Sequence, residues 1–140
     1  MSRRPLRASA VGAVALGGAV GALLRHGVAT AFPDRTDGFP LTIFAVNVVG
    51  CFLLALLPAF TVVRRRPLLP PLLGTGLLGG FTTLSTYSEQ ARALVAAGHA
   101  VTAVTYVVGT LAACLLVVAL ADRFSTAADR ALFEAEEGDE

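Results

Sequence analysis

Residues 79–88 read Gly79-Gly80-Phe81-Thr82-Thr83-Leu84-Ser85-Thr86-Tyr87-Ser88, and this run governs how the whole chain is interpreted. It ends a segment, starting near Leu68, that carries no charged residue. Glycine and hydroxyl residues weaken a helix because they loosen its backbone or compete for its hydrogen bonds. Irregular backbone at membrane depth survives only inside protein or along a wet cavity. The run therefore predicts a functional break in a membrane helix, whereas Gly74 and Gly76 by themselves would indicate close helix packing.

The composition places this segment in a membrane protein. Of 140 residues, 55% are hydrophobic and 15% are charged, against about 25% charged residues in soluble domains. A membrane helix needs about 20 mostly apolar residues. We expect one all-α integral membrane domain over residues 1–140, with four transmembrane helices at about 8–32, 39–63, 68–96 and 100–121. The acidic end, 122–140, is typical of a disordered cytoplasmic tail.

The first span has a second interpretation as a secretory signal. Arg3, Arg4 and Arg7 precede it, and Ala29-Thr30-Ala31 resembles a cleavage site. Its apolar run is long for a signal, and three more spans follow, so we favour a membrane helix.

Arginine distribution predicts the orientation. Four spans place both termini on one side, and that side collects Arg3, Arg4, Arg7, Arg64, Arg65, Arg66, Arg123 and Arg130. Basic residues in short loops favour the cytoplasm. We therefore expect both termini in the cytoplasm of a multi-pass protein of the cell membrane. The net charge of +1 gives no sign of nucleic-acid binding.

Several polar residues within the spans have two interpretations each. Asn47 can face a pore or make an interhelical hydrogen bond, and taken alone the second is the better interpretation. Thr102, Tyr106 and Thr110 share a helix face, so they form a polar track or bond back to their own helix, and both stay open. Arg25 reaches the interface by default, or else attracts anions into a vestibule.

Missing residue types exclude other functions. The apolar parts of the spans hold no Asp, Glu or Lys for proton coupling, and no nucleophile–base pair or nucleotide-binding loop is present. Cys51 and Cys114 are more typical of small buried hydrophobes than of a disulfide or a metal pair. Small residues and hydrogen-bond donors suit passive conduction better than catalysis, so we do not expect an enzyme.

Three motifs in order resemble the CrcB/Fluc fluoride channels. Gly17-Gly18-Ala19-Val20-Gly21-Ala22-Leu23-Leu24-Arg25 is close to GGxxGAxxR, and Val46-Asn47-Val48-Val49-Gly50-Cys51-Phe52 is close to VNxxGxF. The run at 79–88 is close to GGLTTFSTFS. The resemblance covers roughly residues 12–120, and its third motif is quite specific.

The resemblance implies an antiparallel, dual-topology-type dimer of four-helix subunits that exports fluoride passively and so lowers its toxicity. It implies a structural sodium ion at the dimer centre, held by the backbone carbonyls of Gly79 and Thr82. The implied fluoride pathway comprises Asn47, Thr83, Leu84, Thr86, Tyr87 and Ser88, with Thr110 a looser match and Arg25 at the vestibule. Amide and hydroxyl donors can replace the water of a small, strongly hydrated anion, and aromatic ring edges can face it.

The chain departs from the family pattern in two respects. Leu84 stands where the family has Phe, Gln90 where it has Glu, and His26 replaces an aromatic residue. A homodimer inserted both ways needs a weak charge bias, whereas the bias here is strong. The two family phenylalanines that contact fluoride map onto Leu84 and Tyr87, so only one aromatic residue of that pair remains. We therefore hypothesise a heterodimer with a second, oppositely oriented homologue that supplies the complete pair.

Two other functions stay open as alternatives. A small proton-coupled drug exporter has a similar size and span number but needs a carboxylate in its first span, which this chain lacks. A non-transporting membrane assembly subunit would explain the glycine-rich packing but not Asn47 or the polar run at 79–88. An enzyme is the weakest interpretation.

Overall fold

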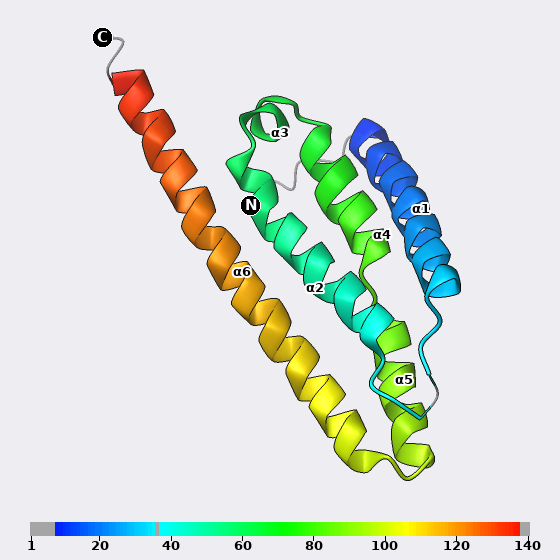
Figure 1. Ribbon diagram of the computed structural model, residues 1–140. Helices are drawn as coiled ribbons and strands as arrows, with labels where there is room; N and C mark the ends of the chain where they lie inside the picture. The colour runs from blue at the N-terminus through cyan, green and yellow to red at the C-terminus, as the bar shows by residue number, and fades with distance from the viewer. Residues whose placement is uncertain (1–7, 36, 138–140) are drawn as a thin grey trace, which may run out of the picture.

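The computed structural model describes residues 8–35 and 37–137, with the backbone alone for 124–137. Within these ranges the chain is helical and contains no strand (Figure 1). The elements are α1 (Ala8–Ala31), α2 (Leu41–Leu56), η1 (Leu57–Ala59), α3 (Thr61–Arg65), η2 (Pro70–Leu78), α4 (Gly79–Phe81), α5 (Leu84–Ala96) and α6 (Ala100–Glu137). This confirms the expected all-α class.

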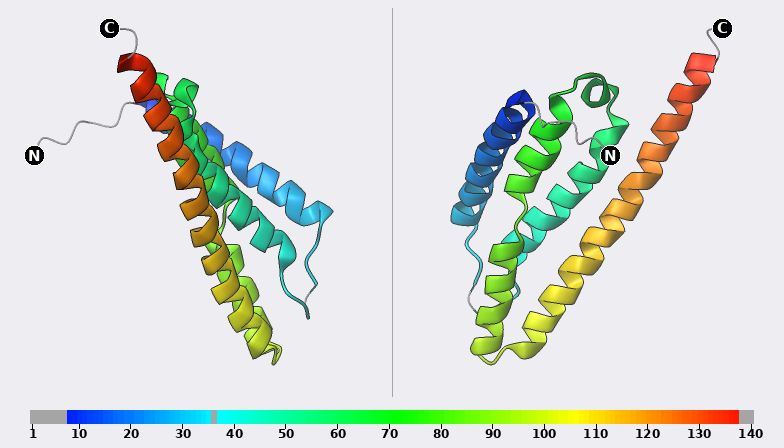
Figure 2. Two further views of the ribbon diagram at one scale, coloured as in Figure 1. Left: turned by 60° about the vertical axis from the view of Figure 1, so that its left-hand side comes forward. Right: turned by 180° about the vertical axis from the view of Figure 1, so that it is seen from behind.

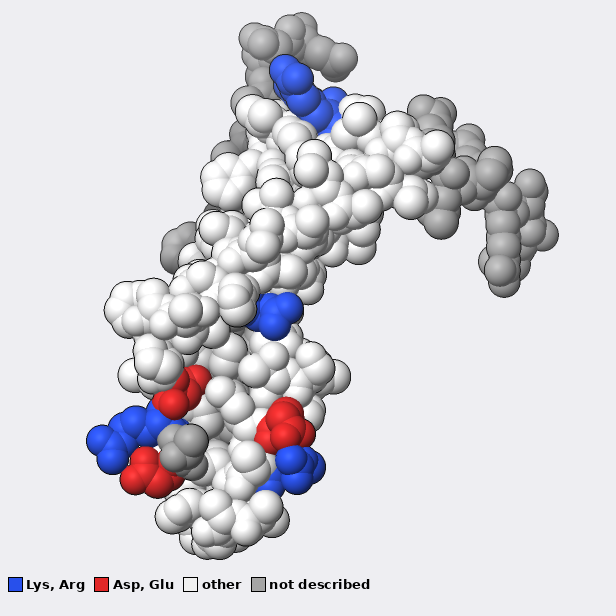
Figure 3. All heavy atoms as spheres, turned by 90° about the vertical axis from the view of Figure 1, so that its right-hand side faces the viewer, with Lys and Arg blue, Asp and Glu red and all other residues white. Residues whose placement is uncertain are grey.

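Three helical segments are long and apolar enough to cross a membrane. They are Ala8–Ala31, Leu41–Ala59 and Ala100–Arg123. Large apolar side chains stand exposed on them, with Leu23 70% and Val101 82% accessible. Charged side chains gather toward the two ends of the face in Figure 3, and the band between is mostly uncharged. The exposed apolar band is the surface that lipid or another subunit would cover.

Two helix ends differ from the expected spans. The second helix begins at Leu41 and passes at Leu56 into the tighter η1 turn, where Pro58 supplies no backbone N–H. The chain is then extended at Phe60 before the short α3. The last helix continues to Glu137, beyond the expected end at residue 121 and into the tail expected to be disordered. Alanine and glutamate are frequent in this extension, and both favour a helix.

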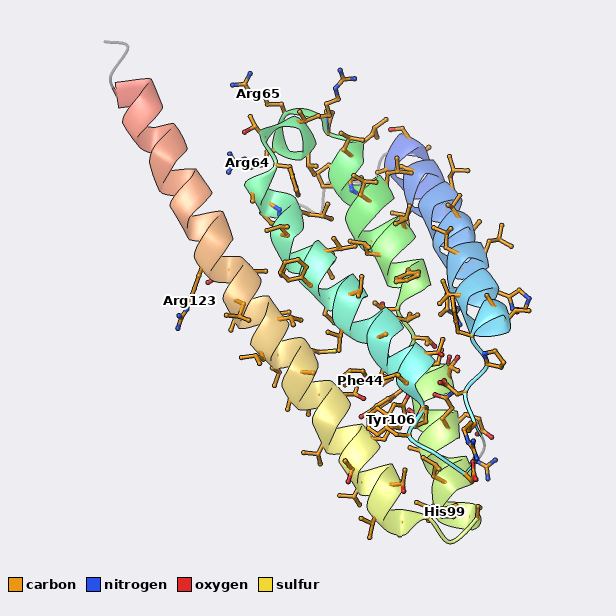
Figure 4. The ribbon with its side chains drawn as sticks, in the orientation of Figure 1. Phe44, Arg64, Arg65, His99, Tyr106 and Arg123 are labelled. Atoms are coloured by element: carbon orange, nitrogen blue, oxygen red, sulfur yellow. The ribbon has the colours of Figure 1, made fainter. Side chains whose placement is uncertain are left out.

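The two ends of the bundle have different charge. The start of α1, the α3 turn and the end of α6 lie at one end of the molecule, whereas the α5–α6 turn lies at the other (Figure 2). Figure 4 places Arg64 and Arg65 at the first end and His99 at the second. Arg3, Arg4 and Arg7 of the predicted basic side lie outside the described residues, as does the side chain of Arg130.

Glycines set the distance between α1 and the η2–α4 run. A Cβ added at Gly17 would overlap the carbonyl oxygen of Leu72, and one at Gly21 would overlap that of Leu77. From the other side, a Cβ at Gly76 would lie 2.9 Å from the carbonyl oxygen of Val14, and one at Gly80 would overlap that of Gly18. The two backbones therefore touch, which is how small residues let membrane helices approach closely.

An aromatic cluster packs between α2, α5 and α6, around Tyr106 near the start of α6. Tyr106 is fully buried and packs with Leu94 and Ala103. The Phe39 ring meets it edge-on with centroids 5.3 Å apart, and the Tyr87 ring lies 5.1 Å from it. Phe44 and Tyr106 point toward each other between α2 and α6 (Figure 4). Edge-to-face pairs of this kind stabilise a core beyond the area they bury.

Candidate functional site

The η2–α4–α5 run is broken within the motif at 79–88. Its helix stops at Phe81, and both Thr82 (φ −73°, ψ 157°) and Thr83 (φ −148°, ψ 124°) are extended. Helix α5 begins again at Leu84. The break that the sequence predicts is therefore present, two residues long and formed by threonines rather than by the glycine pair.

Asn47 on α2 holds the break in place. Its Nδ2 donates to the carbonyl oxygen of Thr83 at 3.1 Å, and its Oδ1 accepts the N–H of Thr83 at 2.8 Å. Asn47 is 9% and Thr83 8% exposed. One side-chain amide thus satisfies both backbone groups of a buried, non-helical residue, as buried polar groups require. The interhelical hydrogen bond, one of the two interpretations of Asn47, is confirmed.

The side chain of Thr83 starts the next helix. Its Oγ1 accepts the backbone N–H of Thr86 at 3.1 Å, which is the usual capping bond at a helix N-terminus. The same oxygen donates to the Thr86 hydroxyl at 3.1 Å and lies 3.2 Å from that of Ser85. Three hydroxyls of the motif therefore form one connected cap at the start of α5.

Because of these bonds, the backbone N–H groups of Thr83 and Thr86 do not donate to helical carbonyls. In an α-helix the carbonyl of Gly79 would accept from Thr83, and that of Thr82 would accept from Thr86. Here the Thr83 N–H donates to Asn47 and the Thr86 N–H to Thr83 Oγ1. The carbonyl oxygens of Gly79 and Thr82 therefore lack their helical donors. They are the two oxygens that the sequence resemblance assigns to sodium.

Arg25 takes part in the same break from the opposite side. Its Nε donates to the carbonyl oxygen of Gly80 at 3.3 Å, across the α1 interface. The side chain is half-buried. Arg25 therefore adds a cationic donor at the C-terminal end of the η2–α4 helix, where carbonyls without helical donors accept positive charge favourably.

A groove of about 250 Å³ lies beside the break, between α2, α5 and α6. It is lined by Asn47, Cys51, Thr82, Thr83, Leu84, Tyr87, Thr110, Leu111 and Cys114. Thr110 is 4% exposed, and its hydroxyl has no hydrogen-bond partner among the residues that the structure describes. Because buried polar groups are nearly always paired, this hydroxyl marks a place where a ligand or water would be held.

The predicted site residues fall into two sets. Asn47, Thr82, Thr83, Leu84, Tyr87 and Thr110 meet at the groove. Gly79 and Ser88 are exposed, Thr86 supports the cap at α5, and Arg25 lies on the α1 side. Leu84 is 75% exposed, so one wall of the groove is open. The hydroxyl of Tyr87 donates to the carbonyl of Val107 at 2.8 Å, so it is already used within the fold.

A hydrogen-bond network joins α6, α5 and the loop before α2. The Tyr106 hydroxyl donates to Gln90 Oε1 at 2.8 Å, and Gln90 Nε2 donates to Asp34 Oδ2 at 3.1 Å. Asp34 Oδ1 in turn accepts the backbone N–H of Thr42 at 2.7 Å, at the start of α2. Tyr106 is therefore a core and network residue, whereas Thr110 of the same helix face is not bonded back to its own helix.

Comparison with known proteins identifies the family of the chain. A sequence model of the family described as CrcB-like protein, Camphor Resistance (CrcB) matches residues 12–121. The chain belongs to the CrcB family. The chain is also 46% identical over 110 residues to "Fluoride-specific ion channel FluC 2" of Streptomyces avermitilis, covering 75% of this chain and 68% of that protein.

Two other family members align over similar or greater lengths. "Fluoride-specific ion channel FluC 2" of Nocardia farcinica is 42% identical over 132 residues, 90% of this chain and 94% of that protein. "Fluoride-specific ion channel FluC" of Paracoccus denitrificans is 42% identical over 105 residues, 75% of this chain and 85% of that protein.

Sequence reasoning missed the two cysteines as residues of the groove. Cys51 follows Asn47 by four positions and Cys114 follows Thr110 by four, so each shares a helix face with a residue already singled out. That spacing was the available signal. Nothing in the sequence indicated that α2 and α6 would bring the two faces together.

Proposed function

We propose that the chain is a subunit of a fluoride channel that exports fluoride passively across the cell membrane. The observation that carries the proposal is the groove beside the Asn47-held break, into which the unpartnered Thr110 hydroxyl faces. Family membership and the names of the similar proteins support the choice of fluoride as the ion. Channel function also fits a groove that offers hydrogen-bond donors without a catalytic pair.

Each donor has a definite capacity for an anion. The Asn47 amide nitrogen carries two hydrogens, and one of them is used on Thr83. The second can donate to fluoride, as can the hydroxyl of Thr110. The ring edge of Tyr87 supplies a weaker, partly positive surface. These groups would replace the water that fluoride gives up on entry. Thr83, Thr86 and Ser88 extend the hydroxyl track in the proposed pathway, and Leu84 contributes an apolar wall.

The residues at the break fit a structural sodium ion. Hard cations prefer oxygen ligands, and unwound carbonyls in membrane proteins commonly coordinate sodium. The carbonyls of Gly79 and Thr82 have lost their helical donors, and Gly79 lies on the exposed face of the run. When bound, sodium supplies positive charge near the pathway without a basic side chain. Two carbonyls are too few for a full shell, so a second subunit would contribute an equal pair.

Exposure of the break supports a dimer. Leu84 is 75% exposed, and Gly79, Ser85 and Ser88 are exposed on the same broken run. Hydroxyls and irregular backbone at membrane depth need protein or a cavity around them. We propose that the η2–α4–α5 run is a fourth transmembrane segment and that an antiparallel subunit covers it. Both termini are cytoplasmic, and the strong arginine bias favours a heterodimer with an oppositely oriented homologue.

The test is fluoride efflux from liposomes, read with a fluoride electrode. The chain is reconstituted alone and together with a co-expressed homologue of the same family. Efflux that excludes chloride in either preparation supports a fluoride channel, and efflux only with the homologue supports the heterodimer. Absence of fluoride efflux from both preparations would overturn the proposal. Thr110→Val should slow this efflux. A Thr30→Ala variant is its matched control, since Thr30 is exposed and bonds only to His26 of its own helix.

Topology is tested separately with a reporter at the C-terminus. A reporter found on the cytoplasmic side alone supports one fixed orientation. Equal signals on both sides would contradict the heterodimer while leaving the channel proposal intact.

A further inference from the structure

The groove contains a pair of thiols that the proposed conduction does not use. Cys51 lies on α2 and Cys114 on α6, and these are the only two cysteines of the chain. Both are free and half-buried. Both thiols line the same groove, and they lie close enough to interact with each other. Two nucleophilic sulfur atoms from different helices therefore meet on the wall that also carries Thr110.

We propose that Cys51 and Cys114 form a binding site for a soft divalent cation that two thiolates coordinate, and that its binding blocks the groove. Thiolate sulfur is the ligand that soft metals select. With the mercuric ion, two S–H bonds break, two S–Hg bonds form and two protons leave to water. Nothing is oxidised or reduced, so no further reactant is needed.

Charge and ligand number narrow the class of cation. Two thiolates and one divalent ion make a neutral unit, whereas a monovalent ion would leave a net negative charge that is costly in an apolar setting. Zinc at structural sites takes four ligands. Among the described residues, no group of three or more His, Cys, Asp or Glu could hold a metal. A soft ion that is satisfied by two sulfurs is therefore the one that fits.

A metal bridge suits the pair better than a disulfide does. A disulfide requires sulfur atoms about 2.05 Å apart, so α2 and α6 would have to close on each other. A metal ion sits between the two sulfurs, so a bridge through it does not require the helices to close to disulfide distance. It would lie beside the Thr110 hydroxyl and Tyr87. The expected block of transport rests on the proposed function, whereas the binding does not.

The first arm measures binding to the purified full chain in detergent. The reduced protein is titrated with mercuric chloride and followed by intact mass and by maleimide labelling. We expect one mercury per chain, with a mass gain of one mercury less two protons, and protection of both thiols. Two mercury atoms per chain, mercury-linked chains or absence of binding would each overturn the site.

Variants separate bridging from simple thiol reactivity. In Cys51→Ala and in Cys114→Ala, the remaining thiol binds mercury without a partner, so it should regain maleimide labelling after a competing thiol washes the protein. The wild-type pair should stay protected under the same wash. Equal protection in the single variants and the wild type would contradict a bridge. The double variant contains no cysteine and should bind no mercury.

The second arm measures fluoride efflux from liposomes before and after mercuric chloride. In the wild type we expect efflux to fall to the rate of protein-free liposomes. The double variant, compared with its own untreated rate, should be insensitive. Two results would contradict the proposed block. In one, mercury inhibits the double variant. In the other, mercury bridges the two thiols of the wild type and does not inhibit its efflux. A chain that binds mercury as expected but transports no fluoride even before mercury is added supports the site and contradicts the proposed function alone.

Discussion

The broken helical run from Pro70 to Ala96 packs against α1 on one side and against α2 and α6 on the other. The two contacts are made in opposite ways. Against α1, glycines remove side chains so that backbones touch, and the helical hydrogen bonds continue. Against α2 and α6, the backbone leaves the helix at Thr82 and Thr83, and the side chains of Asn47 and Thr83 replace the lost bonds. The first contact stabilises the fold by dispersion, and the second creates a polar site.

The comparison shows why small and hydroxyl residues cannot be interpreted by composition alone. Glycine is frequent on the α1 side and threonine at the break, and both weaken helices in isolation. The glycines stay helical because the backbone of α1 packs on them. The threonines leave the helix because Asn47 offers their backbone an alternative partner. The decisive difference is therefore the residue that lies across each interface.

The largest effect is expected on the packing side, at Gly21. A Cβ there would overlap the carbonyl oxygen of Leu77 and come within 2.9 Å of its carbonyl carbon. Backbone cannot move aside as a side chain can, so Gly21→Ala should separate α1 from η2. Overpacking that side chains can absorb costs about 1–3 kcal/mol, whereas here the clash is with backbone, so we expect the whole contact between α1 and η2 to be lost. We expect loss of the monodisperse peak in size-exclusion chromatography and a clear drop in Tm.

The matched control is Gly27→Ala on the same helix. A Cβ at Gly27 meets nothing within 4 Å. Alanine favours a helix over glycine by up to about 1 kcal/mol, so this variant should keep or raise the Tm. Equal losses at Gly21 and Gly27 would show that the close approach of α1 and η2 does not determine stability.

The next effect is expected on the polar side, at Asn47. Asn47→Ala leaves the N–H and carbonyl of buried Thr83 without partners. Each such group costs about 1–3 kcal/mol, so the unfolding free energy should fall by about 2–6 kcal/mol, and fluoride efflux should be lost. Hydrogen exchange at Thr83 should accelerate. A variant that keeps wild-type exchange there would contradict the role of Asn47 in holding the break.

A smaller and more discriminating effect is expected from two threonines of the groove. Thr83→Val removes the cap of α5 and should cost about 1 kcal/mol of stability. Thr110→Val removes a buried hydroxyl that has no partner, so stability should stay equal or rise. Efflux should nevertheless slow in Thr110→Val. Thermal melts and efflux on both variants check this, and destabilisation by Thr110→Val would show that its hydroxyl is used within the fold.

Much of the fold was predictable because its signals are local. Long apolar segments indicated the membrane helices, and Gly79 to Ser88 indicated a broken one, because residue type alone limits helix formation there. The bounds were less predictable. The end of α2 coincides with Pro58 in the η1 turn, and α6 continues as a helix past residue 121, where alanine is frequent.

The residues of the site were predictable from the sequence, but the hydrogen bonds between them were not. Asn47, Thr83 and Thr110 were each singled out, yet only the structure shows that Asn47 bonds to the backbone of Thr83 and that Thr110 bonds to nothing within the described chain. Tyr106 shares a helix face with Thr110 but belongs to the aromatic core. Such differences depend on contacts between segments far apart in the sequence, and residue spacing within one helix carries no information about them.

The smallest effect is expected away from both interfaces, at the exposed pair of Arg35 and Asp37. Arg35 Nε donates to Asp37 Oδ1 at 3.2 Å, and the side chains are 82% and 58% exposed. The hydrogen bond from Arg35 lowers the pKa of the Asp37 carboxyl below its ordinary value of 3.8. Any stability from the pair is therefore present above that ordinary value and lost as the pH falls through the lowered one.

Solvent screens such a pair, so Asp37→Asn should change Tm little at pH 7 and not at all in acid. Melts of wild type and variant from pH 7 down to about pH 1, below both pKa values of a salt-bridged Asp, check this, with high salt as a control that should remove any difference. A loss at pH 7 as large as that of Asn47→Ala would mean that the loop before α2 anchors the bundle. The break would then depend on that loop as much as on Asn47, and the contrast between the two neighbours of the broken run would no longer explain its shape.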